Sequence, residues 1–239
     1  MTRINASSDF SVNNTRIVRR VVGAIPMVEK AIQSNLELPL STQELADALD
    51  EYRGNLQLEG IPMPEVSSRR IDQSRIIYLC EDGGPNLVEL YGDPETLIRD
   101  HSNVVSAVAE ILRKAIEARI AIDPHIKNFV GYGTDLRYVD FSPPLLDSFF
   151  ETRCSVAAGE EESILRRNFS YFGPDYLVCH FAGDLLNLDP SADALYPELR
   201  RLLIAAGLSV ETNVEAFTAK AKSIRALEDL RLQKRIFMI

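Results

Sequence analysis

One long helical stripe limits the folds open to this chain more than any other feature of its sequence. Asp93-Pro94-Glu95 supplies a helix N-cap, a first-turn proline and a first-turn acid. The positions that follow keep the helical period for roughly five turns; they are Leu97, His101, Val104, Val105, Val108, Ile111, Leu112 and Ile116. The pattern predicts a single amphipathic helix from residue 93 to residue 116, packed against a core, with His101 on its apolar face.

The sequence before this helix carries signals for a sheet and one further helix. Residues 16–22 are rich in β-branched side chains and predict a strand that ends at Gly23. Residues 41–44, Ser-Thr-Gln-Glu, form a capping box and predict the start of a helix. Residues 76–80 predict a second strand, which leads into the Gly-Pro cluster at 81–85.

The sequence after the long helix predicts a hairpin and then more helices. Two strand-like runs, 129–132 and 136–139, are joined by Gly133-Thr134-Asp135, and a hairpin is the simplest interpretation. Helical patterns follow at 190–206 and at 214–230. Strands in the first part of the chain and helices in the second predict an α+β fold.

Composition limits the partners and the compartment. The chain has 239 residues, with 26 Lys and Arg against 35 Asp and Glu, and its formal net charge is -9. This charge repels polyanions, so nucleic acid and anionic membranes are poor partners. Three widely spaced cysteines form no C-x-x-C pair, and no stretch approaches the roughly 18 apolar residues of a membrane span. We expect a cytoplasmic protein without a nucleic-acid or membrane partner, and its oligomeric state stays open.

Three oxygen-bearing side chains have a spacing that suits phosphoryl transfer. Asp123 and Asn128 stand as Asp-x-x-x-x-Asn in the loop after the long helix, and Asp140-Phe141 follows the predicted hairpin. The reaction needs a carboxylate near the attacking hydroxyl and oxygen ligands for Mg²⁺. A hairpin between Asn128 and Asp140 folds the chain back, so we expect both to converge on one metal ion while Asp123 lies beside the substrate.

On these residues the sequence resembles the protein-kinase superfamily, most of all its aminoglycoside phosphotransferase and choline kinase branch. The resemblance implies two lobes: a small N-lobe over residues 1–82, with a sheet and one helix, and a mostly helical C-lobe over residues 83–239. The link between them falls near residues 80–85, and the catalytic loop spans residues 121–142. The resemblance also implies Asp123 as the catalytic base and two Mg²⁺ ligands, Asn128 and Asp140.

The same resemblance assigns further residues to catalysis and to nucleotide binding. His125 and Lys127 join Asp123 as catalytic residues, with Lys127 near the transferring phosphate. Four residues are expected at the nucleotide, which is ATP or GTP; they are Arg19, Glu44, Cys80 and Asp82. Arg19 or Arg20 is the nearest basic substitute for the family's strand lysine and Lys30 a more distant one, and Glu44 lies in the helix that supplies its acidic partner. Cys80 to Asp82 would meet adenine through their backbone.

The sequence also departs from the family pattern. Ala121 stands where the family's catalytic loop has histidine, and no Gly-x-Gly-x-x-Gly phosphate loop precedes residue 16. We expect a Mg²⁺-dependent transfer of the γ-phosphate to a hydroxyl on a small molecule. Two alternatives remain open: a non-catalytic binding protein of the same fold, and an enzyme of this fold with another donor. His180 has no role that its sequence context suggests.

Overall fold

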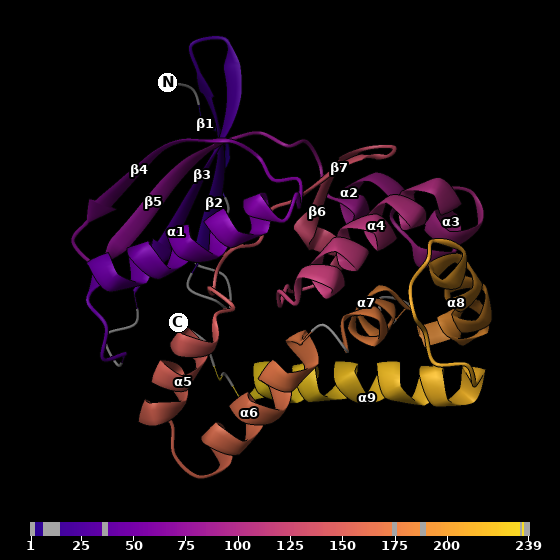
Figure 1. Ribbon diagram of the computed structural model, residues 1–239. Helices are drawn as coiled ribbons and strands as arrows, with labels where there is room; N and C mark the ends of the chain where they lie inside the picture. The colour runs from indigo at the N-terminus through magenta and orange to yellow at the C-terminus, as the bar shows by residue number, and fades with distance from the viewer. Residues whose placement is uncertain are drawn as a thin grey trace.

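The computed structural model describes residues 3–6, 15–34, 38–173, 176–186, 190–234 and 236, and these form an α+β fold (Figure 1). A sheet with one long helix makes up the N-terminal part, and the C-terminal part is built mainly of helices. The α+β class predicted from the sequence is therefore confirmed. Within the described residues, no helix is long and apolar enough to cross a membrane.

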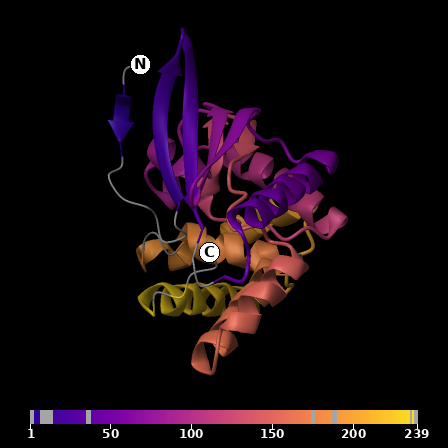
Figure 2. The ribbon, with the colours of Figure 1, turned by 90° about the vertical axis from the view of Figure 1, so that its left-hand side faces the viewer.

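The sheet has five antiparallel strands in the order β1-β2-β3-β5-β4. They are β1 (Arg3–Ala6), β2 (Thr15–Val22), β3 (Ile25–Gln33), β4 (Val66–Asp72) and β5 (Arg75–Glu81). Helix α1 (Thr42–Leu58) lies across one face and contacts β4 and β5 (Figure 1). The β2–β3 hairpin extends beyond the rest of the sheet (Figure 2). Strands β2, β3 and β5 each have a neighbouring strand on both sides, and buried residues of β3 and β5 belong to the main hydrophobic core.

Two predicted strands and the predicted capping box are confirmed. Strands β2 and β5 cover the two predicted runs, and the side chains of Ser41 and Glu44 make the reciprocal capping hydrogen bonds at the start of α1. The sequence does not predict strand β3, because Gly23 indicates the end of the strand before it. Instead Gly23, with φ of 64°, makes the two-residue turn that leads directly into β3.

The prediction of one helix over residues 93–116 was wrong. The structure has two helices there, α3 (Pro94–Arg99) and α4 (Ser102–Ala118). Asp100 ends α3, and His101, with φ of −128° and ψ of 41°, leaves the helical region of backbone space. The ring of His101 packs on Tyr91 at a centroid distance of 4.5 Å. The apolar stripe runs across this break because both helices bury the same side of the chain.

The hairpin and the last helix are confirmed, and the segment before the last helix is shorter than predicted. Strands β6 (Phe129–Tyr132) and β7 (Asp135–Tyr138) pair in register. The other helices are α2 (Leu87–Tyr91), α5 (Asp147–Val156), α6 (Glu160–Phe172), α7 (Leu177–Leu186), α8 (Tyr196–Ala205) and α9 (Val214–Gln233). A 3₁₀ turn, Pro190–Leu195, precedes α8 in place of one helix from residue 190. Every residue of α7 is buried, so this helix is the centre of the helical part.

Helices α7 and α9 lie unusually close, and Gly183 allows it. The two helices run beside each other in both ribbon views (Figures 1 and 2). A Cβ added at Gly183 would stand 2.4 Å from the backbone oxygen of Ala221, far inside van der Waals contact. The close packing brings the polar residues of α7 toward those of α9.

We expect Gly183→Ala to lower the free energy of unfolding by about 1–3 kcal/mol, because the added methyl forces the two helix backbones apart. Gly54→Ala is the matched control, since Gly54 also lies inside a helix but has nothing within 4 Å of the added atom. It should be neutral or stabilise by about 0.5–1 kcal/mol through helix propensity. Urea denaturation of both variants measures this, and equal behaviour of the two would contradict the close contact.

Candidate active site

The loop after α4 is held by hydrogen bonds with the hydroxyls of two buried tyrosines and with one side-chain amide. The hydroxyl of Tyr52, in α1, donates to the carbonyl oxygen of Ala121 over 2.6 Å. The backbone N–H of Asp123 donates to the hydroxyl of Tyr138 over 3.0 Å, and Asn128 Nδ2 donates to the carbonyl oxygen of Asp123 over 3.1 Å. Contacts with α1 and β7 therefore fix the backbone on both sides of the Asp123 side chain.

The hairpin returns the chain to the same loop, as the sequence predicts. The backbone N–H of Val139 donates to the carbonyl oxygen of Asn128 over 2.9 Å. Asp140 is the next residue after Val139, so it lies near Asn128. Asp140 is also close enough to Asp123 for its charge to raise the pKa of that carboxyl. The structure thus brings Asp123, Asn128 and Asp140 into one neighbourhood.

Lys30 is the basic residue at this site, whereas the sequence favoured Arg19 or Arg20. Lys30 projects from β3, and its Nζ lies 2.9 Å from Asp140 Oδ1 and 4.3 Å from the centre of the Phe141 ring. The Lys30 side chain is only 8% exposed and that of Asp140 16%, so the pair is shielded from water. Strand β3 is not predicted from the sequence. Without this strand, the sequence does not indicate that Lys30 faces the loop.

Arg19 lies beside the segment that follows β5 and not beside Asp140. Its guanidinium is partly exposed, lies 3.3 Å from Glu89 Oε2 and 3.8 Å from Asp82 Oδ2, and donates to the carbonyl oxygen of Gly84. Arg19 therefore braces the segment that follows β5 rather than contacting Asp140. Asp82, for its part, accepts a hydrogen bond from the backbone N–H of Gly84 over 2.9 Å.

Two further residues predicted at the nucleotide also have local structural roles. Glu44 is exposed, and its carboxylate accepts a hydrogen bond from the backbone N–H of Ser41, which explains its position at the start of α1. Cys80 has register partners in β3 and β4 on either side, so its backbone belongs to the sheet and is not a free adenine-binding edge. The thiol of Cys80 is buried, and burial raises its pKa.

The predicted link at residues 80–85 is tightly packed against β6. The backbone N–H of Gly131 donates to the carbonyl oxygen of Pro85, and a Cβ added at Gly83 would lie 2.5 Å from a methyl of Val130. The N–H groups of Glu81 and Asp82 already donate to other backbone carbonyls. The link is thus a packed corner of the chain, and the expected adenine contact through these amides does not fit.

The charges of Asp123 and His125 are opposite, and each favours the charged form of the other group. Burial is the largest influence on Asp123 and raises its pKa; His125 lowers it and Asp140 raises it again, to about 7. For His125, burial lowers the pKa, but the charge of Asp123 and the contact with Asp184 outweigh burial and raise it to about 9. A carboxyl group with a pKa near neutrality is suited to accept a proton.

A buried polar network beneath the loop was missed by the sequence interpretation. Asp184, in α7, is 1% exposed at its side chain; its Oδ2 accepts the N–H of Ile126 over 2.8 Å, and its Oδ1 lies 2.8 Å from Arg225 of α9. The same Oδ1 lies 2.5 Å from His125 Nδ1 and pairs with the ring when the ring is protonated. Asp184 therefore anchors the loop to two helices.

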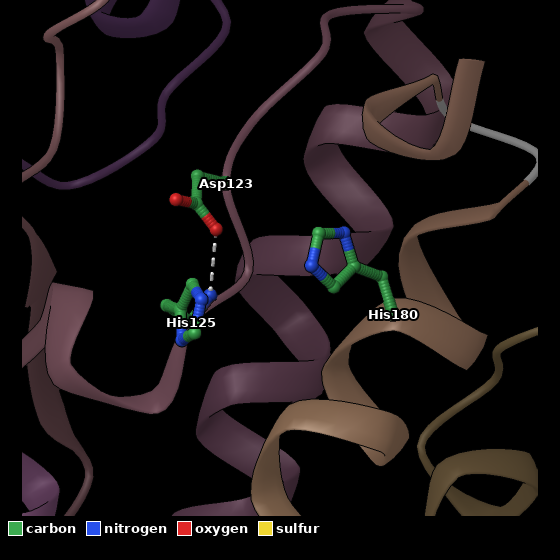
Figure 3. Close-up of side chains that lie close together, drawn as sticks. All are labelled: Asp123, His125 and His180. Carbon is green, nitrogen blue, oxygen red and sulfur yellow. Dashed lines mark hydrogen bonds between the residues drawn. The ribbon is translucent and has the colours of Figure 1, made fainter. Parts of the chain in front are cut away.

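His180 and Glu228 extend the network. His180, one turn before Asp184 on α7, faces Asp123 and His125 from the opposite side of the loop (Figure 3). Glu228 on α9 bonds Asn168 and pairs with Arg231, and these contacts, working against burial, lower its pKa to about 2. Lys127, by contrast, is exposed on the short 3₁₀ turn of the loop (Ile126–Asn128).

No protein-family model matches the sequence, and no curated protein matches it either. Fold and site together define an α+β protein with a shielded lysine–aspartate pair beside the loop that carries Asp123.

Proposed function

We propose that this chain is a Mg²⁺-dependent phosphotransferase that moves the γ-phosphate of ATP or GTP to a hydroxyl group on a small molecule. The proposal includes a two-lobed, kinase-like arrangement, with the sheet and α1 as the N-lobe and the helices as the C-lobe. Asp123 is the base that accepts the proton of the attacking hydroxyl. The helices after residue 160 border the acceptor, for which the net charge of -9 favours an amine-bearing compound.

The ion pair between Lys30 and Asp140 is the observation that carries the proposal. It joins the sheet to the segment after the hairpin, beside the loop that holds Asp123 and Asn128. A lysine on a strand, an acid and an asparagine for the metal, and a second acid for the hydroxyl are the parts that phosphoryl transfer requires. The sequence resemblance supplied three of these parts, and the fold adds the lysine.

The residues present suit Mg²⁺, which prefers oxygen ligands. Asp140 Oδ1 faces Lys30 and accepts the N–H of Ser142, which leaves Oδ2 for a metal ion. The side-chain oxygen of Asn128 accepts no hydrogen bond within the part of the chain that the structure describes. Mg²⁺ at these two oxygens would neutralise charge on the phosphates, while Lys30 would hold a phosphate oxygen and Asp123 would take the proton.

Phosphorus NMR of the chain with MgATP or MgGTP and a panel of hydroxyl compounds tests the proposal. The panel should include amino sugars and amino alcohols, since the proposal favours cationic acceptors. We expect the γ-phosphate signal to be replaced by that of a phosphate ester for at least one acceptor, and only with Mg²⁺. Unchanged nucleotide across a broad panel would contradict catalysis.

The non-catalytic alternative has one observation in its favour. The turn between β2 and β3 offers a single glycine, Gly23, and residues 7–14, between β1 and β2, contain no Gly-x-Gly-x-x-Gly sequence and lie outside the described residues. A chain with few backbone donors for the phosphates would bind a nucleotide without transferring its phosphate. Nucleotide binding without ester formation in the NMR experiment would favour this alternative or a different donor.

A further inference from the structure

Asp123, His125 and His180 form a second arrangement that the proposed transfer does not use as a unit. Their ligand atoms, one carboxylate oxygen and two imidazole nitrogens, all lie within 4.8 Å of one another. Figure 3 shows the three side chains on two different elements: Asp123 and His125 on the loop after α4, and His180 on α7. Residues far apart in sequence thus bring three metal-binding groups to one point.

His125 is oriented as metal-bound histidines usually are. A ligating histidine commonly has its second ring nitrogen held by a carboxylate, which fixes the ring. Here Nδ1 of His125 lies 2.5 Å from Asp184 Oδ1, so Nε2 on the other side of the ring is the nitrogen left for a ligand. Asp184 is itself fixed by Ile126 and Arg225, over 2.8 Å in each case.

The charges around the cluster favour a cation. Three acids, Asp123, Asp184 and Glu228, lie around His125, and Asp184 Oδ1 is 2.5 Å from its Nδ1. Arg225 offsets part of this charge at Asp184, and Arg231 offsets part at Glu228. His180 is buried, at 2% exposed, whereas Asp123 and His125 are partly exposed. A divalent ion between the two imidazoles would meet the same negative field.

We propose that the loop after α4 and helix α7 together bind one divalent transition-metal ion through Asp123, His125 and His180. Two imidazoles with one carboxylate select ions such as Zn²⁺, Co²⁺ and Ni²⁺, whereas Mg²⁺ prefers oxygen ligands alone. Three protein ligands leave one position open for water or another small ligand, as in zinc sites that are not purely structural.

This site has a direct consequence for the proposed transfer. A carboxylate that ligates a transition metal no longer accepts a proton, so an ion bound at Asp123 would inhibit phosphoryl transfer supported by Mg²⁺. The two proposals share Asp123 but are tested separately. Metal binding is measured on the chain alone, without nucleotide or acceptor.

Equilibrium dialysis of the chelator-treated full chain against Zn²⁺ measures the site, and the three histidines of the sequence provide the variants. We expect one equivalent of Zn²⁺ in the unaltered chain and in His101→Gln, because His101 lies against Tyr91 outside the cluster. His125→Gln and His180→Gln should each weaken binding at least about ten-fold. Asp184→Asn should weaken it by about 10- to 100-fold through the loss of ring orientation.

Two results would overturn the metal site. One is a substoichiometric Zn²⁺ content in the unaltered chain; the other is unchanged affinity in both His125→Gln and His180→Gln. Because His180 is buried, circular dichroism must show that its variant is folded. If it is not, the visible absorption of Co²⁺ bound to the unaltered chain decides: intense bands of a nitrogen-ligated, low-coordinate ion support the site, and the weak spectrum of the hydrated ion contradicts it.

Discussion

Replacing Asp123 with asparagine is expected to slow phosphoryl transfer by about 10²- to 10⁴-fold, the usual contribution of a positioned general base. The substitution keeps the size of the side chain and removes its ability to take a proton. The backbone contacts of Asp123 with Tyr138 and Asn128 do not involve the carboxylate. The side-chain oxygen of asparagine can still accept the backbone N–H of His125, which Asp123 Oδ1 accepts over 3.2 Å, so the loop should keep its conformation. Initial rates with saturating MgATP and the best acceptor from the NMR panel measure the effect.

Asp135→Asn is the matched control for this prediction. Asp135 is an exposed aspartate at the start of β7, in the hairpin that follows the loop of Asp123. Its variant should keep the transfer rate within about two-fold. A rate in Asp123→Asn that equals the rate of this control would remove Asp123 from the mechanism and leave the chain with no identified base.

Replacing Asp184 with alanine is expected to cost about 3–5 kcal/mol of stability, because removal of one member of a buried ionic network leaves its partners uncompensated. Asp184 serves the N–H of Ile126, the ring of His125 and the guanidinium of Arg225. Ile126 is buried, so its N–H loses its partner when the carboxylate is removed, and an unsatisfied buried donor is costly. Urea denaturation at neutral pH gives the free energy of unfolding.

Asp193→Ala provides the comparison. The Asp193 carboxylate lies 2.6 Å from Lys222 Nζ, but its side chain is 63% exposed. Exposed pairs of this kind contribute about 0–1 kcal/mol. An equally small loss of unfolding free energy in both variants would show that the network does not anchor the loop. It would also remove the evidence that this network positions Asp123.

Local patterns in the sequence account for the parts of the site that lie in one segment. Asp123, Asn128 and Asp140 are separated by a loop and a hairpin, and the turn residues of the hairpin are recognisable in the sequence. The structure brings the three residues together as the spacing predicts. The capping box at Ser41 is equally local, since its partners are three residues apart. The break at His101 was missed because the apolar spacing continues across it.

The site residues that come from distant segments of the chain could not be predicted from local sequence patterns. Lys30 meets Asp140 across 110 positions, and that contact depends on β3, which begins after a turn that the sequence interpretation took as a stop. His180 and Asp184 lie on a helix buried on all sides, where no polar face marks their direction. Their contacts with Ile126, His125 and Asp123 in the folded chain show that they face the loop.

The thermal stability of the chain with ATP, GTP or ADP, each with and without Mg²⁺, tests the central claim most directly. A ligand that binds only the folded state raises the melting temperature, and a concentration of about 100 times Kd adds about 2.7 kcal/mol. The account predicts a Mg²⁺-dependent rise with at least one nucleotide. It also predicts the loss of this rise in Asp140→Ala, which removes both a proposed metal ligand and the partner of Lys30. A melting temperature unchanged by every nucleotide, or a rise that survives intact in Asp140→Ala, would contradict it.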